Sequence, residues 1–258
     1  MTKPQYVTVS FSGGKDSTAM LLHMMELGEH IDEVINVDTG MEFPAMYDHI
    51  AKVREIVKAN GIKYTELRAD HTFEYYLMEA PPTAERPKRG MGWPGVQIRW
   101  CTKWLKTQLI KDYLKGIEDT YNLVQCVGLA YDEQDRRERE NNKNQRHPLA
   151  EWGWTEADAL TYCYDKGYDW GGLYRHFRRV SCWCCPLQPL ASLRTLYNEY
   201  PAIWEMLEDM DDRIRNDPKI NDRKFRNNAT VADLSRRFAR EARAHREQRT
   251  LDIFGGIE

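Results

Sequence analysis

The sequence predicts an α/β protein whose parallel sheet carries helices on both faces and is followed by a mostly helical C-terminal part. Short β-rich runs alternate with helical runs in the first half of the chain, which is typical of a parallel sheet. A glycine-rich turn joins the first strand to the first helix, and the pattern is helical from residue 154 onward. The chain has 258 residues, enough for one large domain or for a domain with a smaller appendage.

The individual elements follow from hydrophobic patterning and from turn residues. We expect strands at residues 6–11, 34–37, 64–67 and 123–129, and helices from about residue 17 and over residues 45–60. The first helix is apolar on nearly all sides, which predicts a buried helix that ends at Gly28. Further helices are expected over residues 156–166, 190–198, 202–216 and 230–246.

Two irregular segments interrupt this pattern. Residues 80–100 are dense in Pro, Gly and Arg and predict a long surface loop of the lid type, and the polar residues 132–147 predict a second loop. We therefore expect a nucleotide-binding α/β core over residues 1–150, which includes the lid loop. A helical part over residues 151–258 is expected to pack on this core.

Charge and hydropathy restrict the partners. The net charge is −3, so contact with a nucleic acid would depend on local basic groups. Three such groups are Arg86, Lys88 and Arg89; Arg136, Arg137 and Arg139; and Arg175, Arg178 and Arg179. The run of arginines from Arg236 to Arg246 is expected to be a solvated helix face. No export signal and no membrane span are apparent, which favours a cytoplasmic protein with reduced cysteines and no membrane partner.

The turn after the first strand, in the stretch VTVSFSGGKDSTAMLLHMM, has the features of an anion site. Gly13 and Gly14 allow close approach, Lys15 adds positive charge, and Ser12 and Ser17 carry hydroxyl groups. A helix that starts here directs free N–H groups at the same point. The spacing matches neither the Walker A motif nor the dinucleotide fingerprint.

The segment SGGKDS resembles the pyrophosphate-binding loop (PP-loop) of the ATP pyrophosphatases in the adenine nucleotide α-hydrolase superfamily. Other segments resemble motifs of the phosphoadenosine phosphosulfate (PAPS) reductase family. They are Asp38-Thr39-Gly40 with Glu42 and Pro44; Arg99, Cys101 and Thr102 with Leu105 and Lys106; Gly128 with Glu133 and Arg136; His147-Pro148-Leu149 with Trp152 and Glu156; and Leu173-Tyr174 leading to Cys182 and Cys185.

This resemblance implies a HUP-type fold that binds ATP with Mg²⁺. It implies catalytic roles for Lys15, Asp16, Arg99 and Lys106, with Asp16 and Asp38 near the magnesium ion. The residues that it implies for nucleotide binding are Ser10, Ser12, Gly13, Gly14, Lys15, Asp16, Ser17, Asp38, Thr39, Gly40, Gly128, Glu133, Arg136 and Arg137.

The resemblance associates the full SGGKDS form of the loop with binding of ATP, whereas the sulfonucleotide reductases carry a loosened version. The chain also departs from the family pattern at two places, and the second of them, a missing cysteine, points to ATP as well. Ala130 stands where the family usually has an arginine, so Arg136 or Arg137 would supply that anion contact. No cysteine follows Cys185, whereas the sulfonucleotide reductases carry a catalytic cysteine near their C-terminus. We therefore expect cleavage of ATP to AMP and pyrophosphate. A PAPS or adenylyl-sulfate reductase and a non-catalytic regulatory subunit with structural zinc are the alternatives.

The cysteine pair Cys182 and Cys185 has the spacing of a metal knuckle, and a redox dithiol, zinc and iron–sulfur are all open for such a pair. The resemblance to iron–sulfur sulfurtransferases adds Cys101 as a third ligand of a [4Fe–4S] cluster, with Cys184 a weaker candidate. It implies sulfur transfer to a nucleic acid or a small molecule, with a sulfur donor or another partner protein.

Four further side chains are candidates for metal or base contacts. His147 and His176 are candidate ligands if the metal is zinc, and Trp93 and Trp183 are candidates for stacking on a base. Two other cysteines, Cys126 and Cys163, are expected to be buried packing residues.

Overall fold

A computed structural model describes residues 3–139, 143–226 and 228–254, with side chains described up to residue 244. The chain forms two compact units, each built from two segments. Unit 1 consists of Met1–Asp70 and Cys101–Cys182, and unit 2 consists of His71–Trp100 and Trp183–Glu258. The expected division near residue 150 stays a prediction.

Unit 1 contains a five-stranded parallel sheet with the strand order β3-β2-β1-β4-β5. The strands are β1 (Gln5–Phe11), β2 (Glu33–Asp38), β3 (Lys63–Arg68), β4 (Asn122–Val127) and β5 (Gln145–Arg146). The predicted α/β class and HUP-like sheet are confirmed. Because all strands run in one direction, the segments that leave β1, β2 and β4 start at one edge of the sheet.

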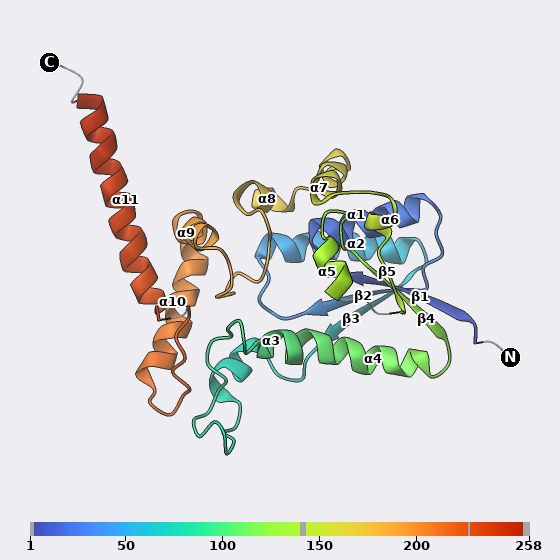
Figure 1. Ribbon diagram of the computed structural model, residues 1–258, viewed down its shortest axis with the longest axis horizontal. Coiled ribbons are helices and arrows are strands. Elements are labelled where there is room, and N and C mark those ends of the chain that lie inside the picture. Colours follow the sequence, from blue (N-terminus) through green and yellow to red (C-terminus); the bar gives the residue numbers. More distant parts are fainter. Residues whose placement is uncertain (1–2, 140–142, 227, 255–258) are drawn as a thin grey trace. The chain divides into compact units, whose positions relative to one another are not determined.

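Helices cover both faces of this sheet (Figure 1). The helices α1 (Lys15–Glu26) and α2 (Pro44–Ala59) lie on one face, and α4 (Gln108–Glu118) lies on the other. The predicted buried character of α1 is confirmed, and Gly28 follows its end with φ +67°. The sequence did not predict α4, which packs Leu114 against Ile35 and Leu123.

Short elements complete unit 1. They are α3 (Trp100–Thr102), whose first residue belongs to unit 2, the π-helix η2 (Lys103–Thr107), α5 (Gln134–Arg139), α6 (Pro148–Glu151), α7 (Glu156–Asp165), the 3-10 helix η3 (Trp170–Gly172) and α8 (Leu173–His176). The prediction of an irregular segment over residues 132–147 was wrong, because it contains α5 and β5. Strand β5 forms because Gln145 and Arg146 pair with β4 residues Gln125 and Cys126, a contact that polarity alone does not reveal.

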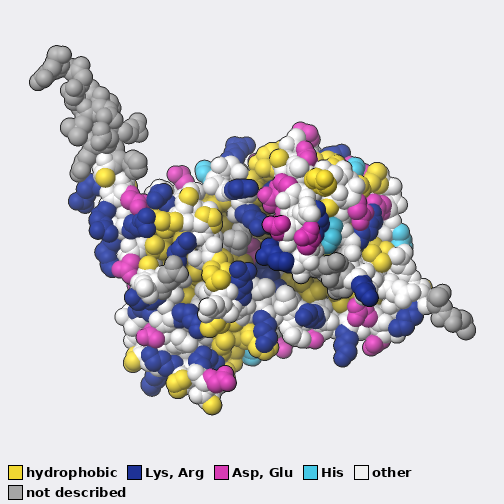
Figure 2. Space-filling model, in the orientation of Figure 1, with side chains coloured by type: hydrophobic (Ala, Val, Ile, Leu, Met, Phe, Trp, Pro, Cys, Tyr) yellow, Lys and Arg dark blue, Asp and Glu magenta, His cyan; other side chains and the backbone are white. Residues whose placement is uncertain are grey.

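Unit 2 contains the π-helix η1 (Tyr75–Glu79), α9 (Leu190–Glu199), α10 (Pro201–Asn216) and α11 (Val231–Phe254). The predicted helices over residues 190–198, 202–216 and 230–246 are thereby confirmed. Lys and Arg side chains gather along the described part of α11 (Figure 2). Its arginines are exposed at positions 236, 237, 240 and 243, as a solvated face requires, and Arg246 lies outside the described side chains.

The loop over residues 80–100 belongs to unit 2 and is irregular, as predicted, but it is internally bonded. The Arg86 guanidinium donates hydrogen bonds to the carbonyls of Lys88 and Gly90 at 2.8 and 2.6 Å. Trp93 is fully buried, and its indole N–H donates to Asp211 at 2.8 Å. The suggestion that Trp93 and Trp183 stack on a base is wrong, because both rings are buried in packing. Among the described helices, none is long and apolar enough to cross a membrane.

A buried polar network in unit 1 supports the turn after β1. The His49 ring nitrogen Nε2 lies 2.9 Å from Thr18 Oγ1, and the His49 ring packs on Trp170 at 4.6 Å between centroids. The Trp170 indole N–H donates to the Gly13 carbonyl at 2.7 Å, and Trp170 holds a left-handed φ of +51°. Burial lowers the pKa of His49 to about 4, with the charge of Lys52 as a smaller cause. His49 is therefore neutral at pH 7.

This network makes stability depend on pH. The unfolded chain protonates His49 near its ordinary pKa of 6.5, while the folded chain resists protonation down to about pH 4. The free energy of unfolding should therefore be highest above pH 6.5, and it should fall by up to about 3 kcal/mol as the pH drops to 4. Urea unfolding across this range should show the fall, and His49→Gln should reduce it. The exposed His30→Gln variant is the control, and equal pH slopes in all three proteins would contradict the prediction.

Candidate active site

The turn after β1 and the end of β4 are packed so tightly that each requires a glycine. Gly13 has φ +78°, and a Cβ atom there would lie 2.6 Å from the Ile50 side chain. A Cβ on Gly128, just after β4, would lie 2.9 Å from the backbone nitrogen of Ser17. The end of β4 and the start of α1 are therefore in direct backbone contact, which fixes the floor of the site.

The turn presents backbone N–H groups at the start of α1. Gly14 is the N-cap residue and provides no side-chain cap. The Ser12 N–H donates to Ser17 Oγ at 3.2 Å, and Ser17 Oγ donates in turn to the Gly14 carbonyl at 3.1 Å. Within the described part of the chain, the N–H groups of Asp16 and Ser17 donate to no acceptor. Free N–H groups at the positive end of a 12-residue helix form an anion site.

Lys15 is buried beside two carboxylates. Its Nζ lies 2.6 Å from Asp16 Oδ1 and 3.6 Å from Glu156 Oε1, and the residue is 4% exposed. Burial raises the pKa of Asp16 more than Lys15 lowers it, and Glu156 and Glu133 add to the rise. The site thus holds a cation and a set of carboxylates within reach of the same N–H groups.

Tyr174 completes the turn from the start of α8. Its hydroxyl oxygen accepts a hydrogen bond from the Lys15 N–H at 2.9 Å. The O–H proton of Tyr174 has no acceptor among the described residues. Burial, with the charge of Asp16 as a further cause, raises the pKa of Tyr174, so the group stays protonated and can donate to an anion in the turn. The sequence shows Tyr174 only as part of a motif, without this role.

A cavity of about 290 Å³ opens over the turn. Its polar lining comes from the turn itself, with Lys106, Arg136 and Arg179 from other segments of unit 1. Its apolar lining consists of Phe11, Ile35, Val37, Ile110, Val127 and Leu129. A charged lining together with an apolar lining fits a ligand with phosphates and a flat apolar ring.

Some of the predicted binding residues line this cavity, and others, Gly13 among them, do not. Those that line the cavity are Ser10, Ser12, Gly14, Lys15, Asp16, Ser17, Gly128 and Arg136. Glu133 is not part of this lining, but its Oε1 accepts hydrogen bonds from two lining residues, Arg136 at 3.2 Å and Arg179 at 2.8 Å. Arg137 does not line the cavity, and it donates instead to the carbonyls of Ala130 and Tyr131. Of the two arginines expected to replace the one missing at Ala130, the structure thus favours Arg136.

The segment after β2 forms its own turn. The Asp38 carboxylate accepts from the Gly40 N–H at 2.8 Å and from the Tyr47 hydroxyl at 2.9 Å, and it pairs with Arg68 at 2.8 Å. Neither Asp38, Thr39 nor Gly40 lines the cavity. Their predicted contact with the nucleotide or with magnesium therefore stays a prediction.

Lys106 joins this turn to two of the candidate cysteines. Its Nζ lies 3.6 Å from Glu42 Oε1, and Cys182 Sγ donates to the same oxygen at 3.4 Å. Burial lowers the pKa of Lys106, but Cys182, Glu42 and Cys101 raise it more, so the net shift is upward. Cys101 and Cys182 therefore lie near one persistent positive charge, on the same side of unit 1 as the cavity that Lys106 also lines.

The candidate metal ligands are divided between the two units. Cys101 and Cys182 belong to unit 1, whereas Cys184 and Cys185 belong to unit 2. Within the described ranges, no group of three or more His, Cys, Asp or Glu side chains is placed to hold a metal ion, His147 and His176 included. The iron–sulfur cluster and its zinc alternative stay predictions. Burial raises the pKa of Cys126 to about 11 and of Cys163 to about 12, which agrees with their predicted packing roles.

The remaining basic residues have varied surroundings. Arg99 is exposed, Lys88 pairs with Asp222 at 3.5 Å, and Arg89 pairs with Asp217 at 2.5 Å. These residues belong to unit 2. The catalytic role of Arg99 and the nucleic-acid contact of Lys88 and Arg89 stay predictions. The sequence missed the supporting residues His49 and Trp170. A histidine in a helix and an aromatic residue beside glycines carry no recognisable signal of such a role.

A Tyr174→Phe variant should test the anion site. The change removes the acceptor of the Lys15 N–H and a donor aimed at the anion, which is worth about 1.5–3 kcal/mol. We expect the Kd for ATP, measured by calorimetry, to rise roughly 10- to 100-fold. The control Tyr164→Phe changes an exposed phenol on α7 and should leave the Kd unchanged. Unchanged ATP affinity in Tyr174→Phe would exclude this role.

Comparison with known proteins agrees with this geometry. A family model described as the phosphoadenosine phosphosulfate reductase domain matches residues 6–188. The uncharacterized proteins MJ0066 and MJ0973 of Methanocaldococcus jannaschii are 27% and 28% identical to the chain over 215 residues. These alignments cover 79% of this chain but 41% and 47% of the two relatives, so the chain spans less than half of their length. The chain belongs to the phosphoadenosine phosphosulfate reductase domain family.

Proposed function

We propose that this protein binds ATP and cleaves it between the α- and β-phosphates, releasing pyrophosphate and activating an acceptor. The observation that carries the proposal is the turn at Ser12–Ser17, with free N–H groups at the start of α1 and a buried lysine. Such a site binds a chain of phosphates better than a single sulfate, because several donors and one cation converge there.

The parts of the cavity suggest a role for each group. The β- and γ-phosphates would accept hydrogen bonds from the turn and from Tyr174, and Lys15 would exchange its carboxylate partners for phosphate oxygens. The adenine would lie against the apolar lining that contains Ile35 and Ile110. Mg²⁺ would enter with the nucleotide, and Asp16, which belongs to the turn, is a carboxylate that could accept it.

The reaction would then be an in-line displacement at the α-phosphorus. An acceptor oxygen attacks, the bond to the bridging oxygen breaks, and pyrophosphate leaves with the electron pair while AMP stays on the acceptor. Lys15, with Lys106 and Arg136 at the edge of the cavity, would stabilise the charge that develops on the phosphates. Displacement of AMP from the acceptor by a sulfur nucleophile would complete a sulfur transfer.

Cys101, Cys182 and Cys185 are the residues that we propose to hold a [4Fe–4S] cluster. A cluster with three thiolate ligands can carry a sulfide at its fourth iron. Two of these cysteines lie near the Lys106 ammonium, whose charge suits thiolates. The acceptor in this proposal is a nucleic acid or a small molecule, and free sulfide can stand in for a sulfur-donor protein in vitro.

A Lys15→Met variant should separate ATP cleavage from the alternatives. Loss of the buried ammonium should lower the rate of pyrophosphate release at least 100-fold, because it acts on the charge of the transition state. The control Lys58→Met changes an exposed helix residue that pairs with Glu55. Release should be measured with tRNA, single-stranded DNA and no acceptor. Sulfite formation from PAPS without ATP use would instead assign the protein as a reductase, and inactivity in both assays would favour a regulatory subunit.

Metal analysis of protein purified without oxygen should test the cysteine proposal. We expect about four iron and four sulfide per chain in the wild type, as a [4Fe–4S] cluster requires. Cys101→Ser, Cys182→Ser and Cys185→Ser should each lose iron. The matched control is Cys126→Ser, because Cys126 is buried in β4 and has no ligand role here. Zinc without iron would reject the cluster and support the structural-zinc alternative.

A further inference from the structure

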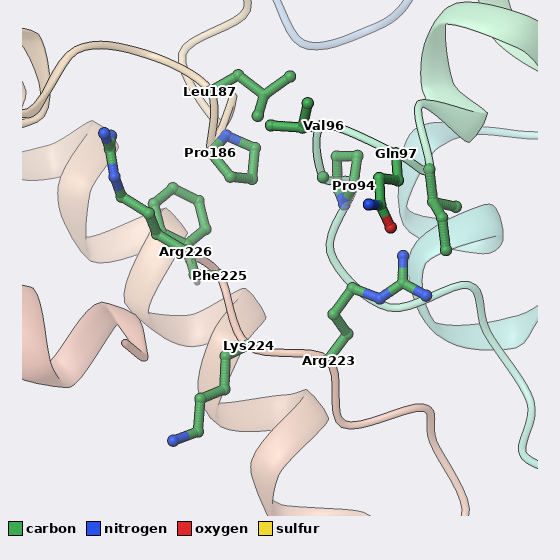
Figure 3. A pocket seen from close by; sticks show the side chains of 11 residues that line it. Pro94, Val96, Gln97, Pro186, Leu187, Arg223, Lys224, Phe225 and Arg226 are labelled. Atoms are coloured by element: carbon green, nitrogen blue, oxygen red, sulfur yellow. The ribbon is translucent and has the colours of Figure 1, made fainter. Parts of the chain in front are cut away.

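A second cavity lies wholly inside unit 2 and has a volume of about 600 Å³. Three chain segments line it: residues 94–98, residues 186–187 and residues 223–226 (Figure 3). None of these segments lines the cavity over the turn, and Pro186 directly follows the candidate ligand Cys185. The volume lies within the range of about 300–1,000 Å³ that is usual for ligand sites.

The charged residues that line this cavity in the described part of the chain are all basic. They are Arg223, Lys224 and Arg226. Within the described chain, none of these three side chains forms an ion pair. Lys224 donates at 3.0 Å to the carbonyl of Asn228, and Arg226 donates to the carbonyl of Gln188; these neutral contacts hold the side chains but leave their charges uncompensated.

Arg223 is the most informative of the three. The ion pairs of nearby arginines, such as Arg215 with Asp211 at 3.2 Å, show that partners are common in unit 2. Arg223 has no such partner among the described side chains, and its guanidinium points into the cavity toward the side chain of Gln97 (Figure 3). Burial lowers the pKa of Arg223, which shows that its charge is costly there. An anion in the cavity would offset this cost.

Another part of the lining is apolar and consists of Pro94, Val96, Pro186 and Leu187 (Figure 3). Pro94 and Pro186 are buried, whereas Val96 and Leu187 are open to water. Val96 is 73% exposed and Leu187 is 38% exposed, which is unusual for aliphatic side chains that lie together. An apolar surface next to an uncompensated positive group fits a ligand that has both an apolar part and negative charge.

We propose that this cavity binds a segment of single-stranded nucleic acid. Phosphates would contact the basic segment 223–226, and a base with its sugar would lie against Pro94, Val96 and Leu187, with the Gln97 amide at the base edge. Three uncompensated cations within four residues match a strand that repeats one negative charge per nucleotide. A peptide would match this lining only if several acidic residues alternated with apolar residues along its sequence.

This binding goes beyond the cleavage of ATP, and only the role of the strand as the sulfur acceptor rests on the proposed function. Pro186 is bonded to Cys185, and consecutive Cα atoms are about 3.8 Å apart. A strand in the cavity would therefore pass close to one of the cysteines proposed to carry the cluster.

Fluorescence anisotropy with labelled 12-nucleotide dT and U strands should test the binding. In the Arg223→Gln, Lys224→Gln double variant we expect the Kd to rise at least tenfold at 100 mM salt. The slope of log K against log salt should flatten by about 0.7 for each phosphate that the variant no longer binds. The matched control is the Arg236→Gln, Arg237→Gln double variant, which removes two exposed charges of α11 and should stay within twofold of the wild type.

A variant of the apolar lining tests the contact with the base, and a competition experiment tests an acidic peptide as the ligand. Val96→Asn should weaken binding at least threefold without changing the salt slope. Equal weakening by both double variants, or no binding of either strand at 50 mM salt, would overturn the proposal. Competition by a glutamate 12-mer as strong as that by unlabelled dT would assign the cavity to an acidic peptide instead. Pyrophosphate release by the same variants, without added strand, reports separately on the ATP proposal.

Discussion

The site depends on the contact between the end of β4 and the start of α1. Gly128 touches the backbone of Ser17, so the sheet edge itself supports the turn that we propose to hold phosphate. The Trp170 indole binds the Gly13 carbonyl from the other side, and Tyr174 binds the Lys15 N–H. A turn held at three points by rigid elements keeps its N–H groups in place before a ligand arrives, which is what electrostatic stabilisation of a charged transition state requires.

The cost of this arrangement is local strain and buried polarity. Trp170 has a positive φ although it is not a glycine, and His49 is buried as a neutral ring against Thr18. Both features are destabilising by themselves. They persist because each is satisfied by a hydrogen bond to the turn or to the helix that follows it. The strain is thus concentrated at the residues that position the site.

Much of this could be predicted from the sequence, because it depends on local patterns. The parallel strands, the buried α1 and the glycine turn follow from short runs of residues, and the C-terminal helices follow from apolar periodicity. Strand β5 could not be predicted, since two polar residues become a strand only through pairing with β4. The same is true of Tyr174, Trp170 and His49, whose roles arise from contacts across 159, 157 and 31 residues of sequence. No sequence pattern distinguishes Arg223 from the other arginines either. Its distinguishing feature is structural, because it has no acidic partner among the described side chains.

The two cavities differ in how their cations are balanced, and this difference favours different ligands. In unit 1, Lys15 faces Asp16 and Glu156, Lys106 faces Glu42, and Arg136 and Arg179 share Glu133. Such a set suits a phosphate that arrives with a divalent ion, because the ion takes carboxylate oxygens while the phosphate takes the freed cations. In the unit 2 cavity, Arg223, Lys224 and Arg226 have no acidic partner in the described chain. A strand whose phosphates carry only loosely held monovalent ions matches that charge, since binding releases those ions to the solvent.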